Sequence, residues 1–313
     1  MDKKIKVLFV GDTHGDDNTP EKRKDSYLDA CLEEMQECVE IADARSCDLV
    51  VHLGDVFHRI EPGPLIRNGY LKILSRAKTP WYTVIGNHDV KHNLSYYPQS
   101  SIRTLVESGV LITGESIEEY GIFLAHHTAE LNDQLRDGYL LDKPYPIVAA
   151  HATITLGPFF GSYVLFDEVK TNDKTKLIVS GHVHDAMEST RADGVQFINP
   201  GSVCREKLNE ANKVKIPQVL YVEYDLNGNL YEIEYIKLEC CKPASEIFKI
   251  EETQLIKDNK KDTQQYIKQI SSMNLLEDDI DIYESLRQSA KIKNIDEKVV
   301  DLAIQTLTAL SDN

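Results

Sequence analysis

The 313-residue sequence predicts an α/β fold with a C-terminal β-hairpin and a small helical tail. Two observations support this prediction. Short apolar runs, typical of buried strands, alternate with segments that repeat apolar residues at helical spacing. From about residue 250 the sequence becomes charged and amphipathic and shows no further strand pattern. We therefore expect one large domain at 1–250 and a separate tail at 251–313.

The composition is typical of a soluble protein of the cytoplasm. Hydrophobic residues make up 42% and charged residues 27% of the chain, and no apolar run is long enough to cross a membrane. Residues 1–10 hold too short an apolar run for a signal peptide, so we expect them to form the first core strand. The six cysteines form no C-x-x-C pair, which favours reduced thiols in a cytoplasm, the host's if the chain is phage-encoded.

The net charge of −16 argues against a broadly basic surface for binding nucleic acid. Clustered acidic ligands, however, are neutralised by bound cations, and an acidic protein can keep a local basic patch. The charge therefore weighs against a nucleic-acid ligand without excluding one.

The first third of the chain alternates strands and helices. Apolar runs predict strands at 7–10, 49–53 and 81–85, and helical spacing predicts helices at 27–44 and 65–77. This order predicts β-α-β units, in which neighbouring strands run parallel.

The middle of the chain is less regular. A helical pattern covers 98–109, and short strands are expected at 110–112 and 122–125. Residues 130–146 and 155–176 show little periodicity and are expected to be loops, where substrate specificity tends to lie.

The last third contains a hairpin and then the tail. Two strand patterns at about 218–238 flank an Asn227-Gly228 turn, which is a strong hairpin signal. In the tail, residues 262–273, 278–290 and 296–310 are expected to form three short helices, each with Asp at or near its start as a cap.

Five predicted strands, at 7–10, 49–53, 81–85, 147–150 and 177–179, lead into Asp, Asn or His. The side chains at these strand ends are Asp12, His14, Asp55, Asn87, His151, His182 and His184. Any one of them could simply cap a helix or close a turn. The carboxyl ends of parallel strands, however, are where open α/β sheets bind ligands. Five such ends together therefore indicate a shared site.

These seven side chains offer oxygen and nitrogen donors and no thiolate. Such a set suits Mn, Fe or Zn rather than a calcium cage or a structural zinc site. Seven ligands are too many for one catalytic ion. With one bridging carboxylate they suit two ions roughly 3.5–4 Å apart, the arrangement of two-metal hydrolases.

The ordered motifs resemble the calcineurin-like metallophosphoesterase superfamily over residues 1 to about 204. They are Asp12-x-His14, Gly54-Asp55, Gly86-Asn87-His88-Asp89, His151 and Gly181-His182-x-His184. The resemblance implies a four-layer αββα sandwich with two divalent ions at a sheet edge, Mn²⁺ first and Fe, Zn or Mg as alternatives. It implies that Asp12, His14, Asp55 and His184 hold one ion and that Asp55, Asn87, His151 and His182 hold the other.

The resemblance also implies a catalytic role for His88. As a non-ligand it would contact the phosphate and protonate the leaving oxygen, while water activated by the ions attacks phosphorus in line. A helix-capping side chain is the alternative for His88. No nucleophilic side chain is required. We expect Asp89 to orient His88 or tie down its loop, and Asp16 and Asp17 to be solvated.

Within the superfamily the chain is most similar to SbcD-type nuclease subunits of DNA repair complexes. The features that carry this likeness are Gly54-Asp55-Val56-Phe57-His58 with Pro62 and Pro64, then Asn199-Pro200-Gly201-Ser202 with Glu210, and finally the hairpin with its short tail. The likeness implies a DNA exonuclease or endonuclease subunit of an SbcCD-like recombination and repair complex, in which His58 places the DNA strand. It also implies an SbcC-like ATPase partner docked on the tail, and a homodimer through 65–77 and 98–109.

Several alternatives remain open on the sequence alone. Gly15-Asp16 stands where that branch usually has Leu-Gly, and the region after residue 238 is short for its DNA-capping domain. The acidic charge favours a small-molecule phosphodiesterase that acts on nucleotides or cyclic nucleotides. An inert scaffold of the same fold is a third alternative.

Single features also have simpler interpretations. His58 can be a surface loop residue, and the apolar face of the last helix can pack within the tail. Basic side chains that could meet a phosphate backbone or simply be solvated are Arg59, Arg67, Arg205 and Lys207.

Overall fold

The computed structural model describes residues 3–91, 93–251, 287, 290–291 and 296–311. The chain falls into two compact units, Met1–Phe248 and Lys249–Asn313. Each unit is described by itself. The larger one carries all the predicted site residues.

The first sheet of the larger unit has five strands in the order β13-β12-β1-β2-β3. Their bounds are β1 Ile5–Val10, β2 Leu49–His52, β3 Trp81–Thr83, β12 Gln218–Tyr224 and β13 Leu230–Lys237. The strands β1, β2 and β3 run parallel, and the hairpin β12–β13 joins β1 antiparallel. The predicted hairpin is thus confirmed.

The second sheet has six strands in the order β10-β11-β9-β6-β5-β4. Their bounds are β4 Ser116–Ile117, β5 Ile122–Ala125, β6 Ile147–His151, β9 Leu177–Gly181, β10 Met187–Thr190 and β11 Gln196–Asn199. The four central strands run parallel and both edge strands run antiparallel. Two short strands, β7 Ile154–Thr155 and β8 Val164–Leu165, pair with each other outside this sheet.

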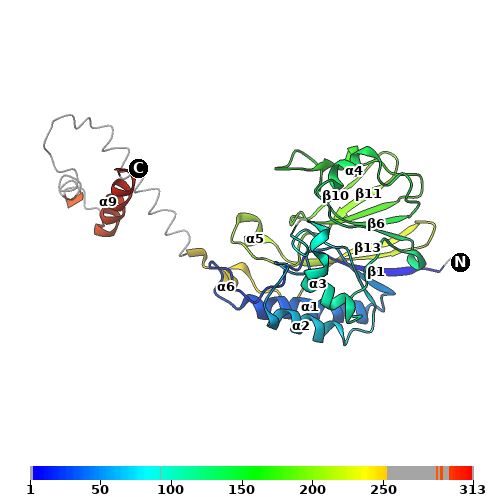
Figure 1. Cartoon of the computed structure of the whole chain (residues 1–313), viewed down its shortest axis with the longest axis horizontal. Helices are drawn as coiled ribbons and strands as arrows, with labels where there is room; N and C mark the ends of the chain where they lie inside the picture. Colours follow the sequence, from blue (N-terminus) through cyan, green and yellow to red (C-terminus); the bar gives the residue numbers. More distant parts are fainter. Residues whose placement is uncertain (1–2, 92, 252–286, 288–289, 292–295, 312–313) are drawn as a thin grey trace. The chain divides into compact units, whose positions relative to one another are not determined.

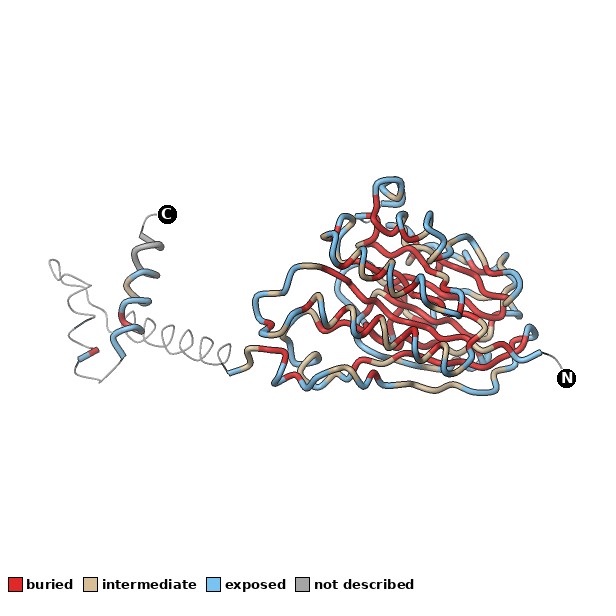
Figure 2. Tube along the Cα trace, turned by 90° about the horizontal axis from the view of Figure 1, so that it is seen from below, coloured by how far each residue is buried: buried red, intermediate tan, exposed pale blue. Residues whose placement is uncertain are grey.

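The two sheets pack face to face between layers of helix. Alternate residues of β1 serve two cores, because successive side chains of a strand point to opposite faces. Val7 and Phe9 belong to the core between the sheets, whereas Leu8 and Val10 belong to the core under the helices. Figure 1 shows α1 and α2 below the first sheet and α4 beyond the second. In Figure 2 the buried trace follows the central strands of this unit. The predicted four-layer sandwich is confirmed.

Helices α1 Tyr27–Ala44, α2 Pro64–Leu74 and α3 Ser101–Glu107 cover the first sheet. The prediction for 27–44 matches α1 at both ends. Ser26 caps this helix by accepting a hydrogen bond from the backbone N–H of Asp29. Pro64 stands in the first turn of α2, where its missing N–H leaves no intrahelical bond unmade.

Shorter helical segments complete the larger unit. They are η1 Leu94–Gln99, η2 Glu118–Tyr120, α4 Leu131–Asp137, η3 Phe166–Glu168, α5 Glu210–Val214 and α6 Ala244–Ile247. The loop prediction for 130–146 was wrong where α4 forms, because Leu131 and Leu135 bury themselves against the second sheet. The strand expected at 110–112 is reduced to one bridge, Tyr82 to Ile112.

The smaller unit contains α9 Glu297–Ser311, which agrees with the helix predicted at 296–310. An ion pair joins Arg287 to Asp301 at 3.1 Å. The helix predicted at 262–273 and most of the one at 278–290 lie outside the described residues. No helix in the described part of the chain has the length and apolar character needed to span a membrane.

Candidate metal centre

The strand ends named in the sequence meet at one edge of the sandwich. Asp12, Asp55 and Asn87 follow the parallel strands β1, β2 and β3 of the first sheet. His151 ends β6 and His182 follows β9, and these two strands are neighbours in the second sheet. Because parallel strands end at the same edge, both sheets deliver their polar side chains to one place.

Glycines let the two sheets approach at this edge. A Cβ built on Gly54 would lie 2.4 Å from Nδ1 of His151, and one built on Gly181 would lie 2.5 Å from Oδ1 of Asp12. Any larger residue would force these strand ends apart. This explains in physical terms why a glycine precedes the polar residue in the sequence motifs.

The backbone is strained where it presents three of these side chains. His14, Asp55 and His182 have φ angles of +44°, +52° and +79°. In this left-handed region a residue with a Cβ is held at a cost of roughly 1–3 kcal/mol. Such strain persists only where the surroundings impose it, and here it coincides with the polar cluster.

One group of donor atoms consists of Asp12, His14 and His184. The Nε2 atoms of His14 and His184 lie 3.0 Å apart. Nε2 of His184 lies 3.6 Å from Oδ2 of Asp12, and Nε2 of His14 lies 3.6 Å from Oδ2 of Asp55. All ligand atoms of this group fall within 4.8 Å of one another.

A second group of donor atoms consists of Asn87, His151 and His182. Oδ1 of Asn87 lies 2.9 Å from Nε2 of His151 and 2.7 Å from Nδ1 of His182. Nε2 of His151 is 3.4 Å from Oδ2 of Asp55. The same carboxylate oxygen, Oδ2 of Asp55, is therefore near both groups.

Burial keeps most imidazoles of the cluster neutral. It lowers the pKa of His14 well below its usual range, and burial with the charge of His151 lowers the pKa of His182 to about 3. Burial and the Lys215 ammonium lower the pKa of His184 to about 4. Neutral imidazole is the form that binds metal ions.

His151 is the exception. Burial by itself lowers the pKa of its imidazole, but the carboxylates of Asp55 and Asp12 outweigh burial and raise it to about 9. The two carboxylates are only 1% exposed, and within the described residues no lysine or arginine side chain bonds to either of them. The cluster thus has an excess of lone pairs and negative charge, and divalent cations fit this donor set.

The comparison with protein families agrees with this geometry. Residues 5–186, more than half of the chain, match the family described as calcineurin-like phosphoesterase. The chain belongs to this family. The predicted family and the predicted enzyme class, a metal-dependent phosphoesterase, are confirmed at the level of the family, which also implies a dimetal site.

Two proteins named DNA double-strand break repair protein Mre11 are similar in sequence. The one from Thermoplasma acidophilum is 24% identical over 249 residues, which cover 72% of this chain and 62% of its own. The one from Archaeoglobus fulgidus is 27% identical over 200 residues, which cover 56% of this chain and 45% of its own. The chain therefore spans about half to three fifths of these relatives. In structure, a dimetal phosphatase from Danio rerio is similar at 12% identity and a TM-score of 0.47, over 74% of this chain and 98% of that one.

His88 lies beside the candidate metal centre. Its backbone N–H donates to Oδ1 of Asp55 at 2.8 Å, and its Nδ1 donates to the carbonyl oxygen of His58 at 2.7 Å. Its ring stands edge-on to that of His14 with centroids 4.7 Å apart. The hydrogen bond to the carbonyl fixes the orientation of the His88 ring.

His58 is half-buried next to His88. The two ring centroids are 5.2 Å apart, and Nδ1 of His58 lies 3.5 Å from a carboxylate oxygen of Glu206. Burial lowers the pKa of His58, and Glu206 opposes this shift. His58 is therefore part of the wall of the cluster and not a freely solvated loop residue.

The acidic residues around these loops have structural partners. Asp89 accepts hydrogen bonds from the backbone N–H groups of Gly86 and Phe57, so it ties the loop after β3 to the loop after β2, as expected. The solvated position expected for Asp16 was wrong, because it is buried in an ion pair with Arg59. The carboxylate of Asp17 caps the start of α2 at Leu65 and Ile66.

Two residues near the cluster were not identified from the sequence. The ring of His127 stacks on His182 with centroids 5.9 Å apart and meets His151 edge-on at 6.0 Å. His127 follows β5, so its position after a strand could have identified it from the sequence.

Lys215 is the second of these residues. Its Nζ donates to the backbone oxygen of His184 at 3.1 Å. No sequence signal marked Lys215, because it precedes the hairpin far from the motifs.

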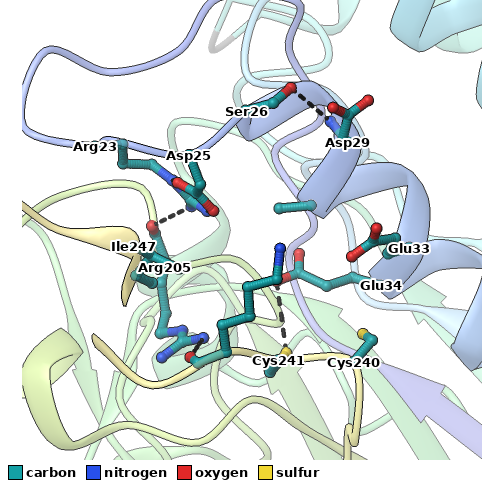
Figure 3. A pocket seen from close by; sticks show the side chains of 12 residues that line it. Arg23, Asp25, Ser26, Asp29, Glu33, Glu34, Arg205, Cys240, Cys241 and Ile247 are labelled. Atoms are coloured by element: carbon teal, nitrogen blue, oxygen red, sulfur yellow. Dashed lines mark hydrogen bonds and ion pairs between the residues drawn. The ribbon is translucent and has the colours of Figure 1, made fainter. Parts of the chain in front are cut away.

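A second polar cluster lies beside α1. We call Arg23, Asp25, Glu34, Arg205 and Cys241 the arginine cluster; they line a cavity of about 160 Å³ (Figure 3). The expectation that Arg205 is solvated or meets a phosphate backbone was wrong. It is 4% exposed, and its guanidinium donates to the backbone oxygens of Lys242 and Lys215 at 2.6 and 3.4 Å.

Proposed function

We propose that this chain is a di-metal phosphodiesterase that cleaves DNA, as the nuclease subunit of an SbcCD-like recombination and repair complex. The observation that carries the proposal is the position of Asp55, whose Oδ2 atom lies 3.4 Å from His151 and 3.6 Å from His14. A shared carboxylate between two donor groups is what a pair of ions requires. The likeness to two DNA double-strand break repair proteins supports DNA as the substrate.

The proposed ligands divide along the two groups. Asp12, His14, Asp55 and His184 would hold one ion, and Asp55, Asn87, His151 and His182 would hold the other. Mn²⁺ is the proposed metal, with Fe, Zn and Mg as alternatives, since the ligands are imidazole and oxygen donors without thiolate. When bound there, two such ions would supply an activated water nucleophile and neutralise charge on the phosphoryl oxygens.

The protein's own residues supply orientation and a proton. The hydrogen bond from the backbone N–H of His88 to Oδ1 of Asp55 fixes the His88 backbone relative to that carboxylate. The carbonyl of His58 accepts from Nδ1 of His88 and so orients its ring, and His88 is proposed to protonate the leaving oxygen of the diester. The imidazole of His58, 5.2 Å from that of His88, is proposed to place the DNA strand next to this proton donor.

A partner is proposed for the tail. In α9, Val300 is 2% exposed and Leu302 is 39% exposed, so part of the Leu302 side chain is accessible. An SbcC-like ATPase docked on this helix would use that surface. In the full-length chain, Leu302→Asp should abolish co-purification with the ATPase, whereas Asp301→Asn should not. Equal binding by both variants would exclude this docking site.

A homodimer is proposed through α2 and the neighbouring η1–α3 segment. Leu65 at the start of α2 is 62% exposed, and Leu94 and Tyr96 of η1 are 38% and 40% exposed. Light scattering should give twice the monomer mass, and Leu65→Asp should shift it to the monomer. A monomeric wild type would rule the dimer out.

The decisive experiment is a cleavage assay with Mn²⁺. End-labelled linear duplex, single-stranded and circular DNA are assayed beside bis-p-nitrophenyl phosphate and cyclic nucleotides. Cleavage of DNA that is lost in Asp55→Asn supports the proposal. Turnover of the small esters alone would identify a small-molecule phosphodiesterase, as the net charge of −16 favours. Binding of two Mn²⁺ without any turnover would identify an inert scaffold.

A further inference from the structure

Two adjacent phenylalanines are exposed in a protein that buries all its others. Phe160 is 97% exposed and Phe159 is 47% exposed. The other six are at most 4% exposed: Phe9, Phe57, Phe123, Phe166, Phe197 and Phe248. Phenylalanine is among the residue types most often buried, so an adjacent exposed pair marks a contact surface.

The two rings stand at the tip of a loop whose ends are held firmly. Strands β7 and β8 pair at its base, where the N–H of Val164 donates to the backbone oxygen of Thr153 at 3.0 Å. From α4, the side-chain amide of Asn132 donates to the backbone oxygen of Ser162 at 3.1 Å, and Arg136 donates to that of Tyr163 at 2.7 Å. The fold thus positions the tip in advance of any partner.

The tip itself leaves both rings accessible. Gly157 and Gly161 flank the pair, and a Cβ built on either glycine would meet no atom within 4 Å. Gly161 has a φ of +83°, which turns the chain back on itself directly after Phe160. Leu156, at the start of the turn, is 51% exposed and extends the apolar tip.

The loop arises beside the metal centre. Phe159 and Phe160 follow His151 by eight and nine residues, so their Cα atoms cannot be more than about 32 Å from that of His151. His151 ends β6 at the edge where the two donor groups meet. A strand of nucleic acid held at that edge and running toward the loop would bring nucleotides a few positions away within reach of the two rings.

The chemistry of the tip favours unpaired bases over other partners. Aromatic side chains stack on bases regardless of sequence, because every base has a π-face. In a chain of net charge −16, which lacks a broad basic surface for a polyanion, stacking would contribute a larger share of the binding. Residues 156–163 contain no lysine or arginine for lipid headgroups, and Asp167 and Glu168 follow closely.

We propose that Phe159 and Phe160 form a stacking platform for unpaired bases of the nucleic-acid substrate beside the metal centre. This inference rests on the proposed function, DNA cleavage. The platform binds the strand a few nucleotides away from the scissile phosphate and favours ends or single-stranded segments over continuous duplex, because only unpaired bases offer a free face.

The test measures binding of a fluorescein-labelled single-stranded 20-mer by anisotropy, with Mn²⁺ and in a His88→Ala background that slows cleavage. Adding Phe159→Ala and Phe160→Ala should weaken binding roughly 5- to 150-fold for each base that no longer stacks on a ring. Replacing both residues by Trp should retain binding. Leu226→Ala, an exposed leucine in the distant hairpin turn, is the matched control and should bind as the background does.

A second readout uses His88-containing protein. The ratio of single-strand cleavage to turnover of bis-p-nitrophenyl phosphate should fall in the double alanine variant, with the melting temperature within about 2 °C of wild type. Equal DNA binding and an unchanged ratio in that variant would overturn the platform while leaving the nuclease proposal intact. A wild type that turns over the small ester but neither binds nor cleaves DNA would overturn the nuclease proposal itself, and the platform with it.

Discussion

The metal centre and the arginine cluster lie in the same unit and both bury carboxylates, but they neutralise them differently. In the arginine cluster, Asp25 accepts two hydrogen bonds from the guanidinium of Arg23, at 2.8 and 2.7 Å. In the metal centre, Asp12 and Asp55 face imidazoles at 3.4 to 3.8 Å. In the arginine cluster a guanidinium bonds directly to the carboxylate, whereas the donor set of the metal centre fits divalent cations from solution.

This difference teaches how to tell a structural polar cluster from a site. Burial and clustering are common to both, so neither property identifies function. What differs is whether the lone pairs already have donors. Glu34 is an intermediate case within the arginine cluster. It is 5% exposed, and in the described part of the chain its hydrogen-bond partner is not a guanidinium but the thiol of Cys241 at 3.6 Å.

The largest expected effect is that of Asp55→Asn. Loss of the shared carboxylate should remove bound Mn²⁺ and reduce turnover of bis-p-nitrophenyl phosphate by about 10⁴-fold or more, since bound ions contribute several kcal/mol to the barrier. Metal content by mass spectrometry and initial rates check this. Asp25→Asn in the arginine cluster is the control and should keep its metals. Loss of metal in both variants would erase the distinction between the clusters.

His88→Ala should reduce cleavage of DNA by about 10²–10⁴-fold, the usual contribution of a general acid, while two Mn²⁺ remain bound. Initial rates with a DNA substrate and metal content by mass spectrometry check this, and turnover of bis-p-nitrophenyl phosphate should fall less because p-nitrophenolate leaves without protonation. Loss of metal in this variant would move His88 into the ligand set and enlarge the metal centre by one residue.

Removing the metal should destabilise the protein. A ligand present at 100 times its dissociation constant stabilises by about 2.7 kcal/mol, which for a unit of this size is about 5–10 °C in melting temperature. A chelator should lower the melting temperature by this amount in wild type and in Asp25→Asn. In Asp55→Asn it should have no effect, and a shift there would mean that the ions bind elsewhere.

Arg205→Ala should lower stability by about 2–3 kcal/mol, because the backbone oxygens of Lys242 and Lys215 lose their buried donor. Urea unfolding followed by the fluorescence of Trp81, the single tryptophan of the chain, measures this change. The exposed Lys207→Ala is the control and should stay within about 0.5 kcal/mol. A loss of bound Mn²⁺ in Arg205→Ala would show that the two clusters depend on each other.

The smallest effect concerns pH. Burial raises the pKa of Glu34 from its usual value to about 7, although Arg23 and Arg205 oppose the shift. The folded state therefore binds this proton more tightly than the unfolded state, so stability falls as pH rises from about 4.5 to about 7, by of order 1–3 kcal/mol. In urea unfolding at pH 5 and pH 8, Glu34→Gln should show a flatter pH dependence than the exposed-residue control Glu33→Gln. Parallel curves for the two variants would contradict the prediction.

The elements that the sequence predicted well are those with a strong local pattern. Helix α1 repeats apolar residues at 3.6-residue spacing and begins at a serine cap, and both ends were predicted. The hairpin carries an Asn-Gly turn between two alternating strands. Helix α4 was missed because Leu131 and Leu135 supply too few apolar positions to show a period in seven residues.

The seven proposed metal ligands could be named from the sequence because each one follows a strand that local pattern reveals, with a glycine at most of the turns. The likeness to a family then divided them into two sets. His127 also follows a strand, β5, and its ring stacks on that of His182. A search of every predicted strand end would therefore have found it from the sequence.

The sequence by itself determined where the strands end and which polar residues stand at those ends. The apolar pattern of a strand and the glycine of a turn depend on only a few neighbouring positions. Tertiary structure decided that Oδ2 of Asp55 lies near both donor groups, that Asp16 pairs with Arg59, and that Phe160 is exposed while every other phenylalanine outside its loop is buried. The first two outcomes depend on contacts between residues about forty to one hundred positions apart. No local pattern specifies such contacts, because they arise only when both sheets pack.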